Sequence, residues 1–288
     1  MKNKKIIFAS TTKNPNIYNL ESQINNYIKV GRKFSEFKII LIESNSDSDK
    51  NINYLKKKYF KEKNVVIKNL GVTDEKVKFS NLRTEHIAYA RNQYLKLIFK
   101  SEKLSFYDYL VVFDSDGVVN RMKYSDLLKI IVSDYDWSAQ FPNQLLFYYD
   151  IYALRAKDWI NHDTLLPFHE SIMNDNNPHY SFSHYISRYI KKIPRNLKPF
   201  NVISAFGGIG IYKIRRIKNS KYKGNLDGKL LCEHVYFNSR INKNYPNTLF
   251  INPQWISHSG INEHTIRSKI LTLLPSSIFN FFYRMFRN

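Results

Sequence analysis

The chain has 288 residues, 43% of them hydrophobic, and carries 45 Lys and Arg against 24 Asp and Glu, a formal net charge of +21. This balance excludes a disordered or fibrous chain, and the single cysteine, Cys232, excludes a disulfide scaffold and a thiolate metal cluster. The length suits one large α/β domain, and the scarcity of cysteine fits a reducing, cytosolic compartment.

The first 120 residues alternate between apolar strand patterns and helical patterns. Strands are predicted at Lys5–Ala9, Phe37–Ile42, Asn64–Ile67 and Tyr109–Phe113, and helices at Ile17–Phe34, Ile52–Lys63 and Arg83–Lys100. This alternation predicts an α/β fold with a mostly parallel central sheet and helices on both faces. Ligands are expected beyond the carboxyl ends of the strands.

The second half is less regular. Strand candidates lie within Asp134–Leu146, Val202–Tyr212 and Thr248–Ile251. Asn161–Asn201 is polar, has no clear period and is interpreted as an insertion over one face. Because no repeat or low-complexity linker divides the chain, we expect one domain over residues 1–260 and a tail over residues 261–288.

The tail predicts a short amphipathic helix after Pro275. Apolar residues at helical spacing and two arginines support it: Ile278, Phe281, Phe282, Met285, Arg284 and Arg287. Such a helix is about 18 Å long, and no apolar run in the chain reaches the roughly 20 residues that span a bilayer. We therefore expect the tail either to pack on the domain or a second subunit, or to bind an anionic membrane surface peripherally from the cytoplasmic side.

Two carboxylates follow the predicted strand Tyr109–Phe113. Asp114 and Asp116 are two residues apart, so in an extended chain they point the same way. Such a pair suits Mn²⁺ or Mg²⁺ and leaves positions for phosphate oxygens and water. The alternative is a turn in which the carboxylates bond to the local backbone.

Arg91 lies on the apolar stripe of the predicted helix Arg83–Lys100, where a charged group must be paired. It is expected either to form an ion pair with a core carboxylate such as Asp114 or to clamp a pyrophosphate bidentately. Arg83, two turns earlier, is a weaker candidate for the same clamp.

Three further features each have a structural and a functional interpretation. Gly207 and Gly208 permit a positive φ, a strand bulge or the close approach of a ligand. Glu233 opens a predicted helix, where its carboxylate either caps the helix or acts on a substrate. Asp150 and Arg155 flank an aromatic run and form either a structural ion pair or a hydrogen-bonding pair beside a bound sugar.

The order of these motifs resembles the GT-A nucleotide-sugar glycosyltransferases. Their Asp-x-Asp motif, glycine-bearing loop, acidic helix start and late histidine correspond here to Asp114/Asp116, Phe206–Gly210, Cys232–His234 and His258. More narrowly, the chain resembles the capsule-associated α-1,3-mannosyltransferases of fungi and their bacterial relatives. The segments that carry this narrower resemblance are Glu43–Ser46, Ala90–Asn92, Tyr149–Arg155 and Cys232–His234.

The resemblance implies transfer of a hexose from a GDP- or UDP-hexose to a hydroxyl of a glycan or lipid-linked glycan during surface polysaccharide synthesis, with retention of anomeric configuration. It implies metal ligation by Asp114, Asp116 and His258, and catalytic roles for Glu233 and Asp150. It also implies donor contacts from strand-end, helix and loop residues: Ser10, Thr11, Glu43, Asn45, Arg83, Arg91, Ser115, Gly207 and Gly208.

Two alternatives stay open. Phe113–Val119 also resembles the first motif of haloacid-dehalogenase-like phosphatases, in which Asp114 would be the nucleophile, although that family carries the motif on its first strand. The net charge of +21 would also suit a basic nucleic-acid-binding protein. Such a protein needs aromatic and basic residues interleaved on one face. No such motif is evident in the sequence, so we expect no nucleic acid partner.

Overall fold

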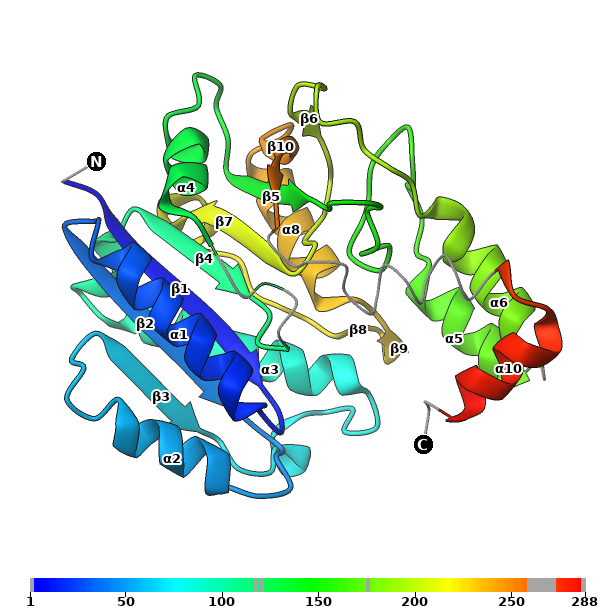
Figure 1. Ribbon diagram of the computed structural model, residues 1–288, viewed down its shortest axis with the longest axis horizontal. Helices are drawn as coiled ribbons and strands as arrows, with labels where there is room; N and C mark the ends of the chain where they lie inside the picture. The colour runs from blue at the N-terminus through cyan, green and yellow to red at the C-terminus, as the bar shows by residue number, and fades with distance from the viewer. Residues whose placement is uncertain (1–2, 117–118, 120–121, 175–176, 258–272, 286–288) are drawn as a thin grey trace.

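The computed structural model describes residues 3–116, 119, 122–174, 177–257 and 273–285. A large central sheet is formed by β1 (Lys5–Thr12), β2 (Glu36–Glu43), β3 (Val65–Asn69), β4 (Tyr109–Phe113), β5 (Ala139–Asn143), β6 (Phe200–Asn201), β7 (Ile209–Lys213) and β10 (Leu249–Ile256). Their order across the sheet is β3-β2-β1-β4-β7-β5-β10-β6 (Figure 1). Two short strands, β8 (Asn225–Leu226) and β9 (Lys229–Leu230), pair separately.

The sheet is mostly parallel. The first half of the chain contributes β3, β2, β1 and β4, which all pair in parallel, and β5 pairs in parallel with β10. The strand β7 runs antiparallel between β4 and β5, and β6 runs antiparallel at the edge. The carboxyl ends of β1, β2 and β4 therefore meet at one edge, as the alternating pattern predicted.

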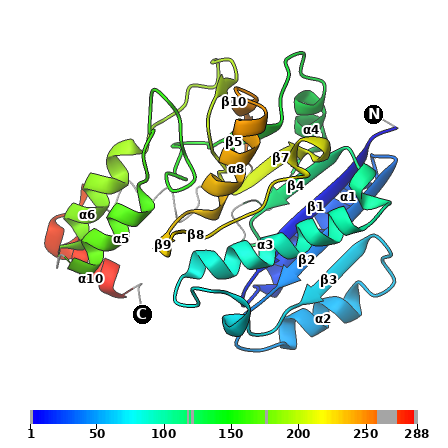
Figure 2. The same cartoon turned by 180° about the vertical axis from the view of Figure 1, so that it is seen from behind.

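Helices cover both faces of this sheet. The helices in the described ranges are α1 (Ile17–Gly31), α2 (Lys50–Lys58), α3 (Arg83–Lys100), α4 (Tyr124–Ile131), α5 (Leu165–Asn174), α6 (Pro178–Tyr185), α7 (Ile214–Ile217), α8 (Glu233–Asn244) and α10 (Ser276–Met285), of which α5, α6 and α10 lie beside the sheet. Alternate residues of β1 point to opposite faces: Ile6 and Phe8 pack with α1, α2 and α4, whereas Ile7 and Ala9 pack with α3 and α8. Figure 2 shows α3 and α8 in front of the sheet.

The first helix shows how the local sequence sets these elements. Asn16 caps α1, because its side-chain oxygen accepts a hydrogen bond of 3.1 Å from the backbone N–H of Asn19. Leu20, Ile24 and Tyr27 then repeat at helical spacing and are fully buried. Each such side chain contributes about 1.5–3 kcal/mol on burial.

The polar segment 161–201 differs from the expectation of an unpatterned insertion, because it contains α5 and α6. These helices form a lobe beside the sheet with α10 (Figure 1). Periodicity could not indicate them, since α5 buries no residue fully and α6 buries only Pro178 and Ser181.

The described part of the tail packs on this lobe. Phe279 is 3% exposed, and its ring centroid lies 4.9 Å from His179 and 5.7 Å from Phe182. The side-chain oxygen of Asn280 accepts a hydrogen bond of 2.9 Å from the backbone N–H of His179. Phe279 and Asn280 therefore pack on the domain, which is one of the two alternatives expected for the tail.

Candidate active site

A cavity of about 1490 Å³ lies at the edge of the sheet where β1, β2 and β4 end. Its wall also includes the beginnings of α3 and α8 and the segment 149–153. The structure thus gathers most of the residues that the sequence indicated for a site. Those that line the cavity are Thr11, Asn45, Arg83, Arg91, Asp114, Ser115, Asp116, Asp150, Gly208 and Glu233.

Three contacts fix the segment that follows β4. The backbone N–H of Asp114 donates to the carbonyl oxygen of Gly208 (2.9 Å), and the Asp114 carbonyl accepts from the side chain of Gln23 on α1 (2.9 Å). The hydroxyl of Ser115 donates to the carbonyl of Thr11 at the end of β1 (2.9 Å). Ser115 therefore positions the Asp-x-Asp segment, while the exposed side chain of Asp116 faces the cavity.

Arg91 connects two parts of the site that are far apart in the chain. Its Nη2 donates to Oδ1 of Asp114 (3.1 Å), and its Nε donates to Oε1 of Glu233 (3.1 Å). The side chain is almost fully buried, and its guanidinium lies 5.3 Å from the ring centre of Phe206. The ion pair with Asp114 that the sequence offered as one alternative is therefore present.

The electrostatics of the cavity follow from this burial. Burial raises the pKa of Asp114 to about 7, Arg91 opposes the rise, and the carboxylates of Asp116 and Asp150 add to it. Burial alone would lower the pKa of Arg91, but Tyr94 and the two bonded carboxylates raise it well above its ordinary value. The site thus holds more negative than positive charge, which favours a bound cation.

The glycine loop before β7 adopts a backbone that suits glycine. Gly207 has φ +69° and Gly208 has φ +83°, so the positive-φ interpretation is correct. The N–H of Gly207 donates to Oδ2 of Asp150 (2.7 Å), and its carbonyl accepts from the side chain of Gln144 (3.1 Å). A Cβ at Gly207 would lie 2.7 Å from that same Gln144 nitrogen. Asp150 thus holds the loop that supports Asp114.

Arg155 makes its hydrogen bonds and its ion pair within the segment 150–163. It forms an ion pair with Asp163 and donates to the carbonyls of Tyr152 (3.2 Å) and Leu154 (2.7 Å). Arg155 is buried and does not line the cavity. Its charge therefore stabilises the segment 150–163.

Three predicted site residues within the described ranges are not on the cavity wall. Ser10 and Glu43 are almost fully buried behind it, and Glu43 accepts a hydrogen bond from the N–H of Ser46 (3.2 Å), which shapes the loop after β2. Gly207 lies behind Gly208 and does not line the cavity itself. His258 lies outside the described residues.

Asn45 has φ +56° and builds a polar network on the cavity wall. Its Oδ1 accepts from the N–H of Thr73 (2.8 Å), and the hydroxyl of Thr73 lies 2.7 Å from Nδ1 of His86 on α3. Asn45 and His86 line the cavity, but Thr73 and His86 could not be identified from the sequence. No motif marks them, since they meet only through the packing of α3 on the sheet.

One buried polar residue, Gln23, was missed although the sequence carried a signal for it, and a second, His234, was interpreted as structural. Gln23 sits on the apolar stripe of α1 beside Leu20 and Ile24, so the reasoning used for Arg91 applies to it as well. His234 is 3% exposed and lines the cavity. Its ring stacks on Phe206 at 3.6 Å, and neither ring nitrogen has a hydrogen-bond partner in the described part of the chain. Burial and the neighbouring Arg91 hold the pKa of His234 well below its ordinary value.

The donor set fits a hard divalent cation shared with a ligand. Asp114 and Asp116 offer carboxylate oxygens at the cavity, and the side chain of Asp114 is 34% exposed. Among the described residues, no three His, Cys, Asp or Glu side chains gather closely enough to hold a metal ion. The two carboxylates would therefore bind a cation together with phosphate oxygens, water or a residue outside the described part.

No family model and no curated protein matches the chain. Among solved structures, GalNAc-T7 with UDP, GalNAc and Mn²⁺ is similar at a TM-score of 0.50 and 16% identity, over 94% of this chain and 48% of that one. The mannosyltransferase PcManGT from Pyrobaculum calidifontis, with GDP-Man and Mn²⁺, is similar at a TM-score of 0.46 and 10% identity, over 99% of this chain and 65% of that one. TarS 1–349 of S. aureus is similar at a TM-score of 0.45 and 13% identity, over 88% of this chain and 58% of that one.

The likeness to GalNAc-T7 confirms the predicted fold class: a GT-A-like α/β fold with a mostly parallel central sheet and flanking helices. This chain spans less than two thirds of the length of each of the three structures. The narrower resemblance to capsule mannosyltransferases stays a prediction.

Proposed function

We propose that the chain is a metal-dependent glycosyltransferase that moves a hexose from a nucleoside diphosphate sugar to a hydroxyl of an acceptor. The observation that carries the proposal is the cavity at the carboxyl edge of the sheet, in which Arg91 joins Asp114 to Glu233. Ligands of open α/β sheets bind at this edge. GalNAc-T7, which shares the fold, was solved with UDP, GalNAc and Mn²⁺.

Asp114 and Asp116 would hold Mn²⁺ or Mg²⁺, with His258 proposed as a further ligand from the motif order. When bound, such a cation offsets the charge that develops on the departing diphosphate. The shortage of a third described ligand supports a site that the donor itself completes. A UDP- or GDP-hexose supplies the phosphate oxygens that such a site needs.

The donor would lie between the strand ends and α3. Thr11 and Asn45 line this side of the cavity, where we propose that the base and ribose bind. Arg83 is exposed on the cavity wall and has no ion-pair partner within the described residues, so its guanidinium is available to a phosphate. Arg91 is buried and already holds two carboxylates, which favours a role in positioning Asp114 and Glu233.

Glu233 and Asp150 are the proposed catalytic carboxylates. Glu233 is the first residue of α8, where the positive helix end and Arg91 both stabilise its charge. Its carboxylate would position donor or acceptor in a retaining enzyme, as the resemblance implies, and would act as the general base in an inverting one. Asp150 lies on the cavity wall next to the glycine loop, where it would contact the sugar.

We propose a glycan or lipid-linked glycan as acceptor, in surface polysaccharide synthesis on the cytoplasmic side of a membrane. No helix in the described ranges is both long and apolar enough to cross a bilayer. The net charge of +21 supports contact with an anionic surface. For the tail, the test compares vesicle flotation of the full chain with a chain ending at Pro275. Equal flotation of both would exclude the tail as the anchor.

The enzymatic proposal is tested by incubating the protein with a panel of UDP- and GDP-hexoses in Mn²⁺ and measuring release of nucleoside diphosphate. We expect one donor to be turned over and Glu233→Gln to lower kcat by about 10²–10⁴-fold with little change in donor affinity. The product anomer, read by NMR, tests retention. Unchanged kcat in Glu233→Gln would reduce Glu233 to a helix-capping residue.

A further inference from the structure

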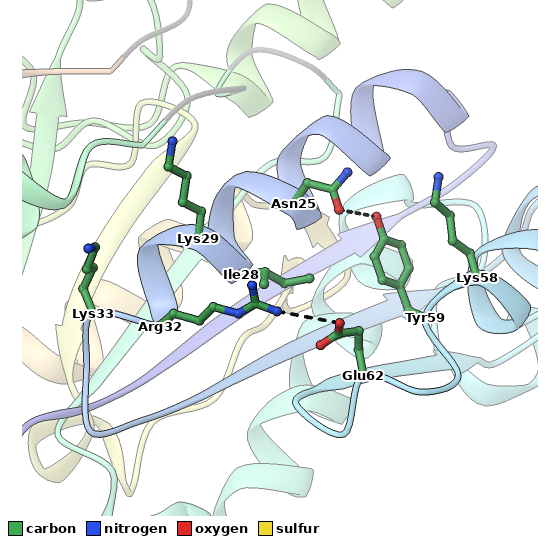
Figure 3. Close-up of a pocket in the computed structure, with 8 residues that line it drawn as sticks. All are labelled: Asn25, Ile28, Lys29, Arg32, Lys33, Lys58, Tyr59 and Glu62. Carbon is green, nitrogen blue, oxygen red and sulfur yellow. Dashed lines mark hydrogen bonds and ion pairs between the residues drawn. The ribbon is translucent and has the colours of Figure 1, made fainter.

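A second surface of the molecule carries features that the proposed reaction does not use. Helices α1 and α2 lie side by side on one face of the sheet, with a groove of about 520 Å³ between them (Figure 3). The groove includes Ile28 and Tyr59, and the Tyr59 hydroxyl donates to the side chain of Asn25 across it (2.9 Å). Its other lining residues are mostly basic: Lys29, Arg32, Lys33, Lys58 and one acid, Glu62.

The positive charge of this groove is only partly compensated. Lys58 pairs with Glu21 (2.7 Å), and Arg32 approaches Glu62 (3.8 Å). Lys29 and Lys33 are exposed and form no ion pair within the part of the chain that the structure describes. Figure 3 draws Lys29 and Lys33 without a dashed contact to the other residues of the groove. Lys57 and Lys61, both exposed, add charge beside the groove.

The same two helices expose large aromatic side chains. Tyr18 on α1 is 81% exposed, Tyr54 on α2 is 49% exposed, and Phe60, just after α2, is 85% exposed. The ammonium of Lys58 lies 5.6 Å from the ring centre of Tyr54, so basic and aromatic groups are interleaved. This exposure adds nothing to the fold, since the buried faces of α1 and α2 already supply the core.

We call this surface the basic aromatic face. It comprises Tyr18, Lys29, Arg32, Lys33, Tyr54, Lys57, Lys58, Phe60 and Lys61. The sequence analysis found no such combination, because the residues are spread over two helices that only the fold brings together.

We infer that the basic aromatic face binds an anionic membrane surface, with lipid phosphates in the groove and the aromatic rings at headgroup depth. Lysines near a bilayer are attracted by anionic lipids, and Tyr and Phe partition into the interface. Nucleic acid fits less well. Single strands are usually bound in a charged groove where bases stack on aromatic platforms, whereas these rings project from the outer side of two packed helices.

The position of this face relative to the cavity has a functional consequence, which rests on the proposed function. The cavity wall includes residues 13–16 and 44–47, and these loops lead directly into α1 and α2. With 15 residues in α1, Lys29 lies roughly 20 Å from the cavity edge. A membrane on the basic aromatic face would therefore lie within reach of a lipid-linked acceptor in the cavity.

The test measures co-flotation of the full chain with vesicles of phosphatidylcholine alone or with 30% phosphatidylglycerol. We expect binding only to the anionic vesicles. Replacing Lys29, Lys33 and Lys58 together by Gln should weaken it by roughly 100-fold, and the triple Arg replacement should keep it. The matched control replaces Lys192, Lys198 and Lys243 by Gln, which removes the same charge from exposed positions elsewhere. It should change binding less than about threefold, because distant charges are screened.

A second variant tests the aromatic part. Tyr18→Ser with Phe60→Ser should lower binding by at least tenfold at 0.5 M salt, where the lysine contribution is screened. Equal losses in the two Lys→Gln triples, or binding that only removal of the tail abolishes, would overturn the inference. The inference would also be overturned if the protein bound no vesicles but bound double- or single-stranded nucleic acid through these lysines. Flotation needs no turnover, so its failure leaves the proposed reaction untouched, and a failed donor screen leaves this inference standing.

Discussion

Replacing Arg91 by Met removes the one cation that the structure shows bonded to both Asp114 and Glu233. Met fills a similar volume, so the change tests charge rather than packing. The two carboxylates then share the cavity with no bonded cation, and repulsion between them must be met by protonation or by a bound metal. The expected result is a less stable protein that responds more strongly to Mn²⁺.

The magnitude follows from the burial of the three groups. Removing one partner of a buried ion pair costs about 3–5 kcal/mol. Glu233 has a side-chain exposure of 8%, but Asp114 is 34% exposed and is partly screened by water. We therefore expect a loss of about 3 kcal/mol in the free energy of unfolding at pH 8 in EDTA. The loss should shrink as pH falls toward 7, because without Arg91 the pKa of Asp114 rises above about 7 and its carboxylate takes up a proton.

The assay is urea unfolding followed by tryptophan fluorescence, with and without Mn²⁺. Arg155→Met is the matched control, since Arg155 is also buried and ion-paired but lies outside the cavity wall. Both variants should be destabilised, but Mn²⁺ should restore stability only in Arg91→Met, because the cation replaces the lost charge at Asp114. A loss below about 1 kcal/mol, or equal Mn²⁺ responses in the two variants, would refute the reasoning.

Three further predictions test other parts of the account. Because the pKa of Asp114 is raised from 3.8 to about 7 in the folded protein, its contribution should make metal-free protein lose stability as pH rises from about 4 to 7; Asp114→Asn should remove that part of the slope in urea titrations. Gly207→Ala should cost about 1 kcal/mol more than Gly71→Ala in unfolding experiments, since both have positive φ but only Gly207 has a neighbour within 3 Å of the added Cβ. Phe279→Ala should cost about 3 kcal/mol by thermal or urea unfolding and Ile278→Ala less than 1, because only Phe279 is buried.

The fold could be predicted from the sequence where apolar strand patterns and helical patterns alternate regularly. In the first half, buried strands such as Tyr109–Phe113 alternate with helices whose apolar stripes face the sheet, so period and order sufficed. Arg91 was identifiable because a charge on an apolar stripe needs a partner, and Glu233 because it opens a helix. In the lobe, α5 buries no residue fully and α6 buries only Pro178 and Ser181, and the segment 161–201 showed no clear period in the sequence.

The site could be predicted only in outline, because its residues come together through long-range packing. The strand pattern predicted Asp114 at a strand end. The hydrogen bond between Arg91 and Glu233, which are 142 positions apart, depends on how α3 and α8 pack on one face of the sheet. Ser10 and Glu43 were expected at the donor because they end strands. Their side chains point inward instead, since alternate residues of a strand face opposite ways.

The most direct test of the central claim is calorimetric titration of UDP and GDP into the protein in Mn²⁺. We expect one nucleotide to bind with a Kd in the micromolar range, and EDTA or Asp116→Ala to weaken binding by at least 100-fold without unfolding the protein. Arg155→Lys, which keeps the charge and does not line the cavity itself, should bind as the wild type does. Equally tight binding in EDTA and in Asp116→Ala would contradict a metal-bridged diphosphate at the Asp-x-Asp segment.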